Sequence, residues 1–121
     1  MINYTREELA NALSIVSSTI INCEKFQPKF EEGTPQHSLL KNRIKALYIS
    51  KVLITGENII DTYSKEELIE ALPPVTSVIS KCEKANQKFE KGTVSYNRTK
   101  KIIDAMYIAK SLITNEISKR S

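Results

Sequence analysis

The chain has 121 residues, 40% of them hydrophobic and 26% charged, with a formal net charge of +4 at pH 7. This balance is typical of a folded globular protein and excludes an intrinsically disordered chain, which combines low hydrophobicity with a high net charge. Three glycines and four prolines are too few for a turn-rich β-sheet protein, so the composition favours helices.

The second half of the chain repeats the first at a constant offset of 59 residues. Sliding residues 4–57 onto 63–116 pairs Tyr4 with Tyr63 and Gly33 with Gly92, and about half of the aligned positions are identical. A repeat of this length is one supersecondary unit that cannot bury its own apolar face. The sequence therefore predicts two repeats, 1–58 and 59–121, that form one structural unit about a pseudo-twofold axis.

Each repeat begins with a signal for a helix start. Thr5 with Glu8, and Ser64 with Glu67, have the spacing of a capping box, in which hydroxyl and carboxylate each accept a backbone N–H of the other residue. Apolar residues then recur at alternating spacings of four and three as far as the glycine-threonine turns. This period predicts long first helices, each packed nearly parallel to a neighbour.

Prolines complicate the first helix of the second repeat. Pro73 and Pro74 each remove a backbone hydrogen bond and clash with the preceding turn. We therefore expect a kink or a break near residues 72–74 rather than an unbroken helix from residue 65 to 91.

A second helix is expected in each repeat, over about residues 36–55 and 95–114. Gly33 and Gly92 are suited to end the first helix of each repeat, and Thr34 and Thr93 are suited to be the N-caps of the second helices. The predicted fold is all-α, a tandem repeat of two helical hairpins forming a pseudo-twofold four-helix bundle. The residues expected to be buried near its axis are Leu13, Ile20, Cys23, Ile44, Leu47, Leu72, Ile79, Cys82, Ile103 and Met106.

The sequence offers little that could support catalysis. His37 is the single histidine, and both cysteines lie on apolar stripes, where they are expected to be reduced core residues rather than a disulfide or a metal site. No glycine-rich phosphate loop and no zinc-like spacing of His and Cys occurs. We therefore predict a protein that is not an enzyme and needs no cofactor or metal.

The first residues contain neither the basic nor the apolar region of a secretory leader. In addition, no stretch approaches the ~20 apolar residues of a membrane-spanning helix. The sequence therefore predicts a cytoplasmic location and no membrane partner.

A polar stripe recurs on both second helices. Lys41, Tyr48 and Thr55 are spaced by seven residues, and Lys100, Tyr107 and Thr114 repeat this spacing. An aromatic ring between ammonium groups can stack on a base while the lysines meet phosphate, and a guanidinium can bind phosphate bidentately. The candidate ligand-binding residues are Lys41, Arg43, Tyr48, Lys51, Arg98, Lys100, Tyr107 and Lys110.

A structural role explains the same stripe. A tyrosine at the rim of a core commonly packs its ring and leaves its hydroxyl in water, and lysines beside it extend to solvent. Duplication of one ancestral hairpin would also make both stripes alike without any functional demand.

The segment 92–113 resembles the helical-hairpin domain of phage proteins that counter CBASS and Thoeris defence. The shared pattern is a turn glycine, a helical threonine, Ala-Met-aromatic and a closing Ala-x-x-x-Ile, here Gly92, Thr99, Ala105, Met106, Tyr107, Ala109 and Ile113. The matching residues of the first repeat are Gly33, Ala46, Leu47, Tyr48 and Ile54. The resemblance implies a non-catalytic oligomer that sequesters a cyclic nucleotide or cyclic ADP-ribose between its subunits.

The sequence thus predicts a non-enzymatic helical binding protein, and the resemblance implies a cyclic nucleotide-type signalling ligand sequestered in phage counter-defence. This anionic small molecule would lie against the two stripes. The alternative is a protein–protein interaction or regulatory helical module that acts as a homo-oligomer. Nucleic acid is a less suitable partner, because proteins that bind it usually carry a denser cationic stripe.

Overall fold

The computed structural model describes residues 4–56 and 62–120, of which 83% are helical. Helix α1 covers Arg6–Phe26 and leads into a short 3-10 helix, η1 (Gln27–Lys29); α2 covers Pro35–Thr55, α3 covers Lys65–Asn86 and α4 covers Val94–Lys119. These described residues contain no strand, so the all-α prediction is confirmed. The boundary predicted between the repeats, at residues 58 and 59, lies outside the described residues.

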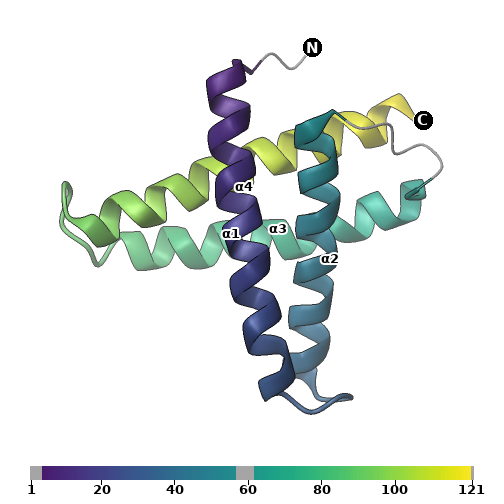
Figure 1. The fold of residues 1–121 in the computed structure, drawn as a ribbon, viewed down its shortest axis with the longest axis horizontal. Helices are drawn as coiled ribbons and strands as arrows, with labels where there is room; N and C mark the ends of the chain where they lie inside the picture. Colours follow the sequence, from purple (N-terminus) through teal and green to yellow (C-terminus); the bar gives the residue numbers. More distant parts are fainter. Residues whose placement is uncertain (1–3, 57–61, 121) are drawn as a thin grey trace.

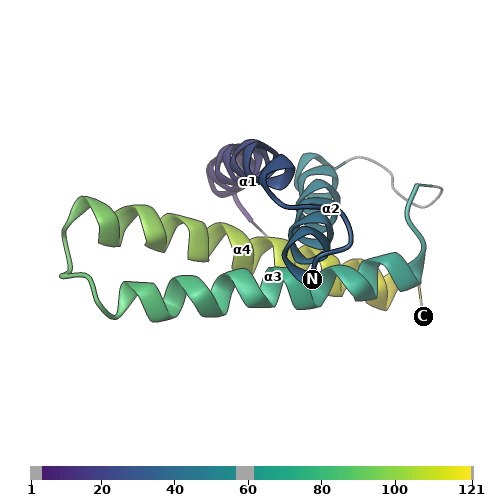
Figure 2. The ribbon, with the colours of Figure 1, turned by 90° about the horizontal axis from the view of Figure 1, so that it is seen from below.

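The helices form two antiparallel hairpins that cross each other. In Figure 1, α1 lies beside α2 and α3 lies beside α4, while one hairpin runs at a steep angle across the other. Figure 2 shows the two hairpins as two stacked layers. The nearly parallel packing predicted from the sequence therefore describes the helices within a hairpin, whereas the contact between hairpins is a crossing.

The predicted capping boxes are formed at both long first helices. Glu8 N–H donates to Thr5 Oγ1 at 3.0 Å, and Thr5 N–H donates back to Glu8 Oε1 at 2.9 Å. Ser64 and Glu67 form the same reciprocal pair at the start of α3. Each box satisfies donors that a helix N-terminus would otherwise leave without partners.

Glycine–threonine turns connect the two helices of each hairpin. Gly33 and Gly92 have φ angles of 88° and 89°, a left-handed conformation that is costly for residues with a Cβ. The next residues, Thr34 and Thr93, are the N-caps of α2 and α4. Helices α1 and α3 end several residues before these glycines, at Phe26 and Asn86, and are therefore shorter than the sequence pattern predicted.

Helix α3 continues unbroken through Pro73 and Pro74, so of the kink or break expected near residues 72–74 the break does not occur. The carbonyl groups that lose their hydrogen-bond donors are those four residues earlier, at Ile69 and Glu70. Both residues are exposed, so water can hydrogen-bond to these carbonyls in place of the missing N–H groups.

The buried core consists of one stripe from each helix. Five of the predicted core residues are buried: Ile20, Cys23, Leu47, Ile79 and Met106. Four more are partly buried against them: Leu13, Ile44, Leu72 and Cys82. Ile103 is also only partly buried. Both cysteines are free thiols.

Four buried alanines line the grooves between the crossing hairpins. Ala12 and Ala105 lie between α1 and α4, and Ala46 and Ala71 lie between α2 and α3. Each is at most 4% exposed. Because the distance between crossing helices depends on the side chains at the contact, methyl groups here allow a close approach.

None of the described helices combines the length with the hydropathy that crossing a bilayer would require.

Replacing Ile20, which is 3% exposed, with alanine should lower the free energy of unfolding by about 2–5 kcal/mol, because it leaves a cavity in the core. The matched control is Ile21→Ala, since the neighbouring Ile21 is 54% exposed and its loss should change stability by less than about 0.5 kcal/mol. Urea unfolding followed by circular dichroism measures both. Equal effects of the two substitutions would show that the buried face of α1 is assigned wrongly.

Candidate functional site

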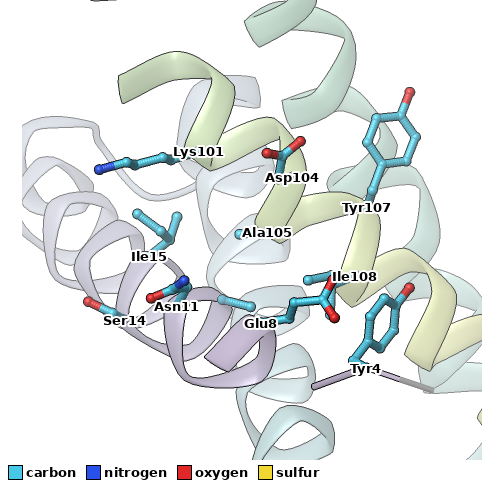
Figure 3. Close-up of a pocket in the computed structure, with 11 residues that line it drawn as sticks. Tyr4, Glu8, Asn11, Ser14, Ile15, Lys101, Asp104, Ala105, Tyr107 and Ile108 are labelled. Atoms are coloured by element: carbon cyan, nitrogen blue, oxygen red, sulfur yellow. The ribbon is translucent and has the colours of Figure 1, made fainter. Parts of the chain in front are cut away.

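A groove of about 580 Å³ lies between α1 and α4, where the hairpins cross. Its volume is within the range of small-molecule sites, about 300–1,000 Å³. We call it the α1/α4 groove; its lining residues are Tyr4, Glu8, Asn11, Ala12, Ser14, Ile15, Lys101, Asp104, Ala105, Tyr107 and Ile108. Figure 3 shows these side chains, which come from α1 and α4 except for Tyr4, which precedes α1.

Helical periodicity places these side chains on the walls of the α1/α4 groove. On α4, Lys101, Asp104, Ala105 and Ile108 follow the spacing of three and four residues that defines one helix face. The alanine and isoleucine side chains provide an apolar surface, and the charged side chains provide polar contacts beside it. The groove therefore combines an apolar surface with several hydrogen-bonding groups.

Two carboxylates in the α1/α4 groove have oxygen atoms that can still accept hydrogen bonds. Glu8 uses Oε1 for the N-terminal cap of α1, and Oε2 takes part in none of the hydrogen bonds described. No salt bridge within residues 4–56 and 62–120 involves Asp104 or Lys101. In Figure 3 the ammonium end of Lys101 points away from Asp104. Both carboxylates therefore remain available to a ligand.

A second groove, of about 530 Å³, lies between α2 and α3. Its lining residues are Leu39, Asn42, Lys45, Ala46, Ile49, Glu67, Glu70, Ala71, Pro73, Pro74 and Ser77. Nine of them correspond, at the offset of 59, to lining residues of the α1/α4 groove, as Glu67 corresponds to Glu8 (67 − 8 = 59). We call it the α2/α3 groove.

An ion pair spans the α2/α3 groove. Lys45 Nζ lies 2.8 Å from Glu67 Oε2. This hydrogen bond raises the pKa of Lys45, and it lowers the pKa of Glu67, which also accepts the Ser64 N–H. At the equivalent positions the α1/α4 groove has Asp104 in place of lysine and Glu8 in place of Glu67. With Glu70 in the α2/α3 groove and Lys101 in the α1/α4 groove, each lining has two carboxylates and one ammonium group, so the grooves differ in where these charges lie.

The two stripe tyrosines bond to carboxylates within their own hairpins. Tyr48 Oη donates to Glu24 Oε2 at 3.0 Å, and Tyr107 Oη donates to Glu83 Oε2 at 3.2 Å. These hydrogen bonds raise the pKa of both phenols. The tyrosines thus connect the helices of each hairpin, a structural role in which the hydroxyl bonds a carboxylate rather than water, and a negative charge lies at each hydroxyl.

The eight predicted ligand-binding residues do not meet in one pocket. Tyr107 lines the α1/α4 groove, while Lys41 lines a separate pocket of about 720 Å³ at the first hairpin turn. The other six line none of the three pockets described: Lys51 and Lys110 are partly buried, as is Arg43, and Tyr48, Arg98 and Lys100 are exposed.

Arg43 lies near both thiols. Burial raises the pKa of Cys23 and of Cys82, and the positive charge of Arg43 opposes this increase at both. Two of its guanidinium nitrogens, Nε and Nη2, are buried and have no hydrogen-bond partner among the described residues. Arg43 is therefore an interior cation at the core edge rather than a surface group on the stripe.

Sequence reasoning missed the carboxylates of the α1/α4 groove, Glu8 and Asp104. Glu8 was interpreted only as a capping residue, and Asp104 was not considered. A signal was present, because aligning the repeats pairs Asp104 with Lys45, a reversal of charge. That reversal points to a groove only once the fold shows that Asp104 and Lys45 line equivalent grooves.

Within the described ranges, no group of three or more His, Cys, Asp or Glu side chains is placed to hold a metal ion. Comparisons with known protein families, with curated proteins and with solved structures find no match to this chain.

The Lys45–Glu67 pair should make the free energy of unfolding depend on pH in the acidic range. Because the folded-state pKa of Glu67 is lowered, the stabilisation is present above the unfolded-state pKa and is lost as the pH falls through the folded-state value. Thermal midpoints measured from neutral to acidic pH should therefore fall less steeply for Lys45→Met than for the native chain.

The control is Lys101→Met, since Lys101 lines the other groove without a described ion pair. Its acid dependence should match that of the native chain. Identical acid dependence of Lys45→Met and the native chain would contradict the assigned role of the pair.

Proposed function

We propose that this chain is a non-enzymatic helical binding protein whose α1/α4 groove holds a small ligand. The observation that carries the proposal is the groove itself, with a volume of about 580 Å³, apolar side chains and polar groups with bonding capacity to spare. Such a combination is typical of small-molecule sites, where a few polar groups orient a ligand against an apolar surface.

We also propose that the two hairpins are related by a pseudo-twofold axis. The linings of the two grooves correspond at the offset of 59 residues. The hydrogen bonds from Tyr48 to Glu24 and from Tyr107 to Glu83 correspond at the same offset. Under this symmetry the two grooves are equivalent sites whose charged residues stand at different positions.

The resemblance to phage sponge proteins supplies one candidate ligand class, a cyclic nucleotide or cyclic ADP-ribose. Tyr107 supports it, because this side chain lines the α1/α4 groove and its ring is available for stacking on a base. Glu83 weighs against a phosphate near the Tyr107 hydroxyl, and Glu24 does the same at Tyr48. The lysines of the stripes would have to offset these charges.

A second candidate function is assembly into a homo-oligomer. Ile21, Phe26 and Phe30 near the end of the first hairpin are 54%, 53% and 40% exposed. Exposed apolar groups of this size favour a protein contact when they are close together. Size-exclusion chromatography with light scattering would give a dimer or larger species for the native chain and a monomer for Phe26→Ser with Phe30→Ser.

Isothermal titration calorimetry with cyclic di- and trinucleotides, cyclic ADP-ribose, uncharged nucleosides and alkylamines tests the groove as a site. Whatever ligand binds, Tyr107→Ala should weaken its binding, by about 5- to 150-fold if a base stacks on the ring. Tyr48→Ala is the matched control, since Tyr48 makes the equivalent bond but lies outside the described groove linings.

Two outcomes would refute this proposal. One is the absence of heat with every compound of the panel. The other is binding that Tyr107→Ala and Tyr48→Ala change to the same extent, because the ligand would then lie outside the α1/α4 groove.

A further inference from the structure

We propose that Arg43 binds a small carboxylate anion where the two hairpins meet. This inference goes beyond the proposed function, because Arg43 is not part of the lining of the α1/α4 groove. Its basis is the guanidinium group, whose buried nitrogens have no acceptor in the described parts of the chain.

Two nitrogens of Arg43, Nε and Nη2, are buried and have no hydrogen-bond partner within residues 4–56 and 62–120. These atoms form one edge of the planar guanidinium, and their N–H groups point in the same direction. Such an edge matches the two oxygens of a carboxylate, which accept two parallel hydrogen bonds. The nitrogens without partners are therefore the pair that suits a carboxylate.

Burial cannot neutralise this guanidinium, because arginine stays protonated in proteins. A buried charge without a partner strongly destabilises a fold. The two salt bridges described, Lys45–Glu67 and Arg120–Glu116, do not involve Arg43. The positive charge therefore needs a negative partner from outside the described residues.

Arg43 lies near residues of both hairpins. Its positive charge opposes the increase in pKa that burial causes at Cys23, on α1, and at Cys82, on α3. Asn86 follows Cys82 by four residues, so the two side chains share one face of α3. Two polar side chains with unused bonding groups therefore lie near Cys82, because Asn86 Oδ1 is also buried and without a partner among the residues described.

The Asn86 side chain can also serve an anion. Turning its amide over replaces Oδ1 by the NH2 group, which donates hydrogen bonds. Arg43 and Asn86 would then both present donors, which is the requirement of an anion site.

The fold itself does not require a charge at the position of Arg43. Ile102 corresponds to Arg43 at the offset of 59 (102 − 43 = 59), and it packs against the core. An apolar side chain therefore suffices at the equivalent position of the other repeat. Residues that break such a rule of packing are expected at functional sites, and binding an anion gives Arg43 a function of this kind.

The ligand should be small and singly charged. Neither Arg43 nor Asn86 lines any of the three pockets described, which indicates a site smaller than these. One carboxylate neutralises one guanidinium, whereas a dianion would leave a negative charge in the interior. Arg43 as a whole is only partly buried, so the site lies near the surface, where a small anion can enter.

Thermal unfolding in sodium formate tests this inference, with sodium gluconate, a much larger carboxylate, keeping the ionic strength constant. A ligand that binds only the folded chain raises its thermal midpoint. The midpoint of the native chain should rise by about 5 °C once formate exceeds its dissociation constant tenfold. Arg43→Met should abolish this rise.

The matched control is Arg98→Met, which removes the same charge from an exposed arginine and should keep the full response to formate. Arg43→Lys keeps the charge without the planar edge, so it should lose most of the response. Circular dichroism before heating checks that each variant retains its helices. If Arg43→Met does not fold, Arg43→Lys provides the comparison.

A native chain whose midpoint does not respond to formate would overturn the inference, as would a response that Arg43→Met leaves unchanged. A midpoint that rises with protein concentration in the native chain, but not in Arg43→Met, would overturn the small-anion form. The partner of Arg43 would then be a carboxylate of a second copy of the chain.

Discussion

The close crossing of the two hairpins at four alanines is the constraint on which the rest of this structure depends. Ala12 and Ala105 line the α1/α4 groove, Ala46 and Ala71 line the α2/α3 groove, and all four are buried. A larger side chain at these positions would push the helices apart and separate the leucine, isoleucine and valine stripes that form the core on either side. The small alanine side chains therefore determine how closely the larger apolar side chains of the two hairpins can pack.

The same crossing produces the grooves. Two hairpins packed side by side would cover each other along their length. The crossed hairpins cover each other only in part, and grooves lie between α1 and α4 and between α2 and α3. In one groove Lys45 and Glu67 neutralise each other across the opening. Glu70 leaves that lining with a second carboxylate, and the α1/α4 groove likewise has two carboxylates, Glu8 and Asp104, and one ammonium group, Lys101. The positions of these charges, and the ion pair described in the α2/α3 groove, distinguish the two.

Local signals in the sequence were sufficient for the helices but not for their arrangement. Capping boxes and glycine turns depend on neighbouring residues, so Thr5, Ser64, Gly33 and Gly92 could be assigned from the sequence. The spacing of apolar residues identifies the buried face of a helix and does not determine the angle at which another helix crosses it. The groove carboxylates were missed for the same reason, because only the crossing brings Glu8 and Asp104 to the lining of one groove.

Chemical unfolding of Ala105→Leu tests the crossing most directly. If the helices approach closely at Ala105, the added volume should lower the free energy of unfolding by about 1–3 kcal/mol. Ala10→Leu, on the exposed side of α1, should leave stability within about 0.5 kcal/mol of the native value. A leucine at position 105 that is tolerated as well as one at position 10 would contradict the close crossing and, with it, the account of both grooves.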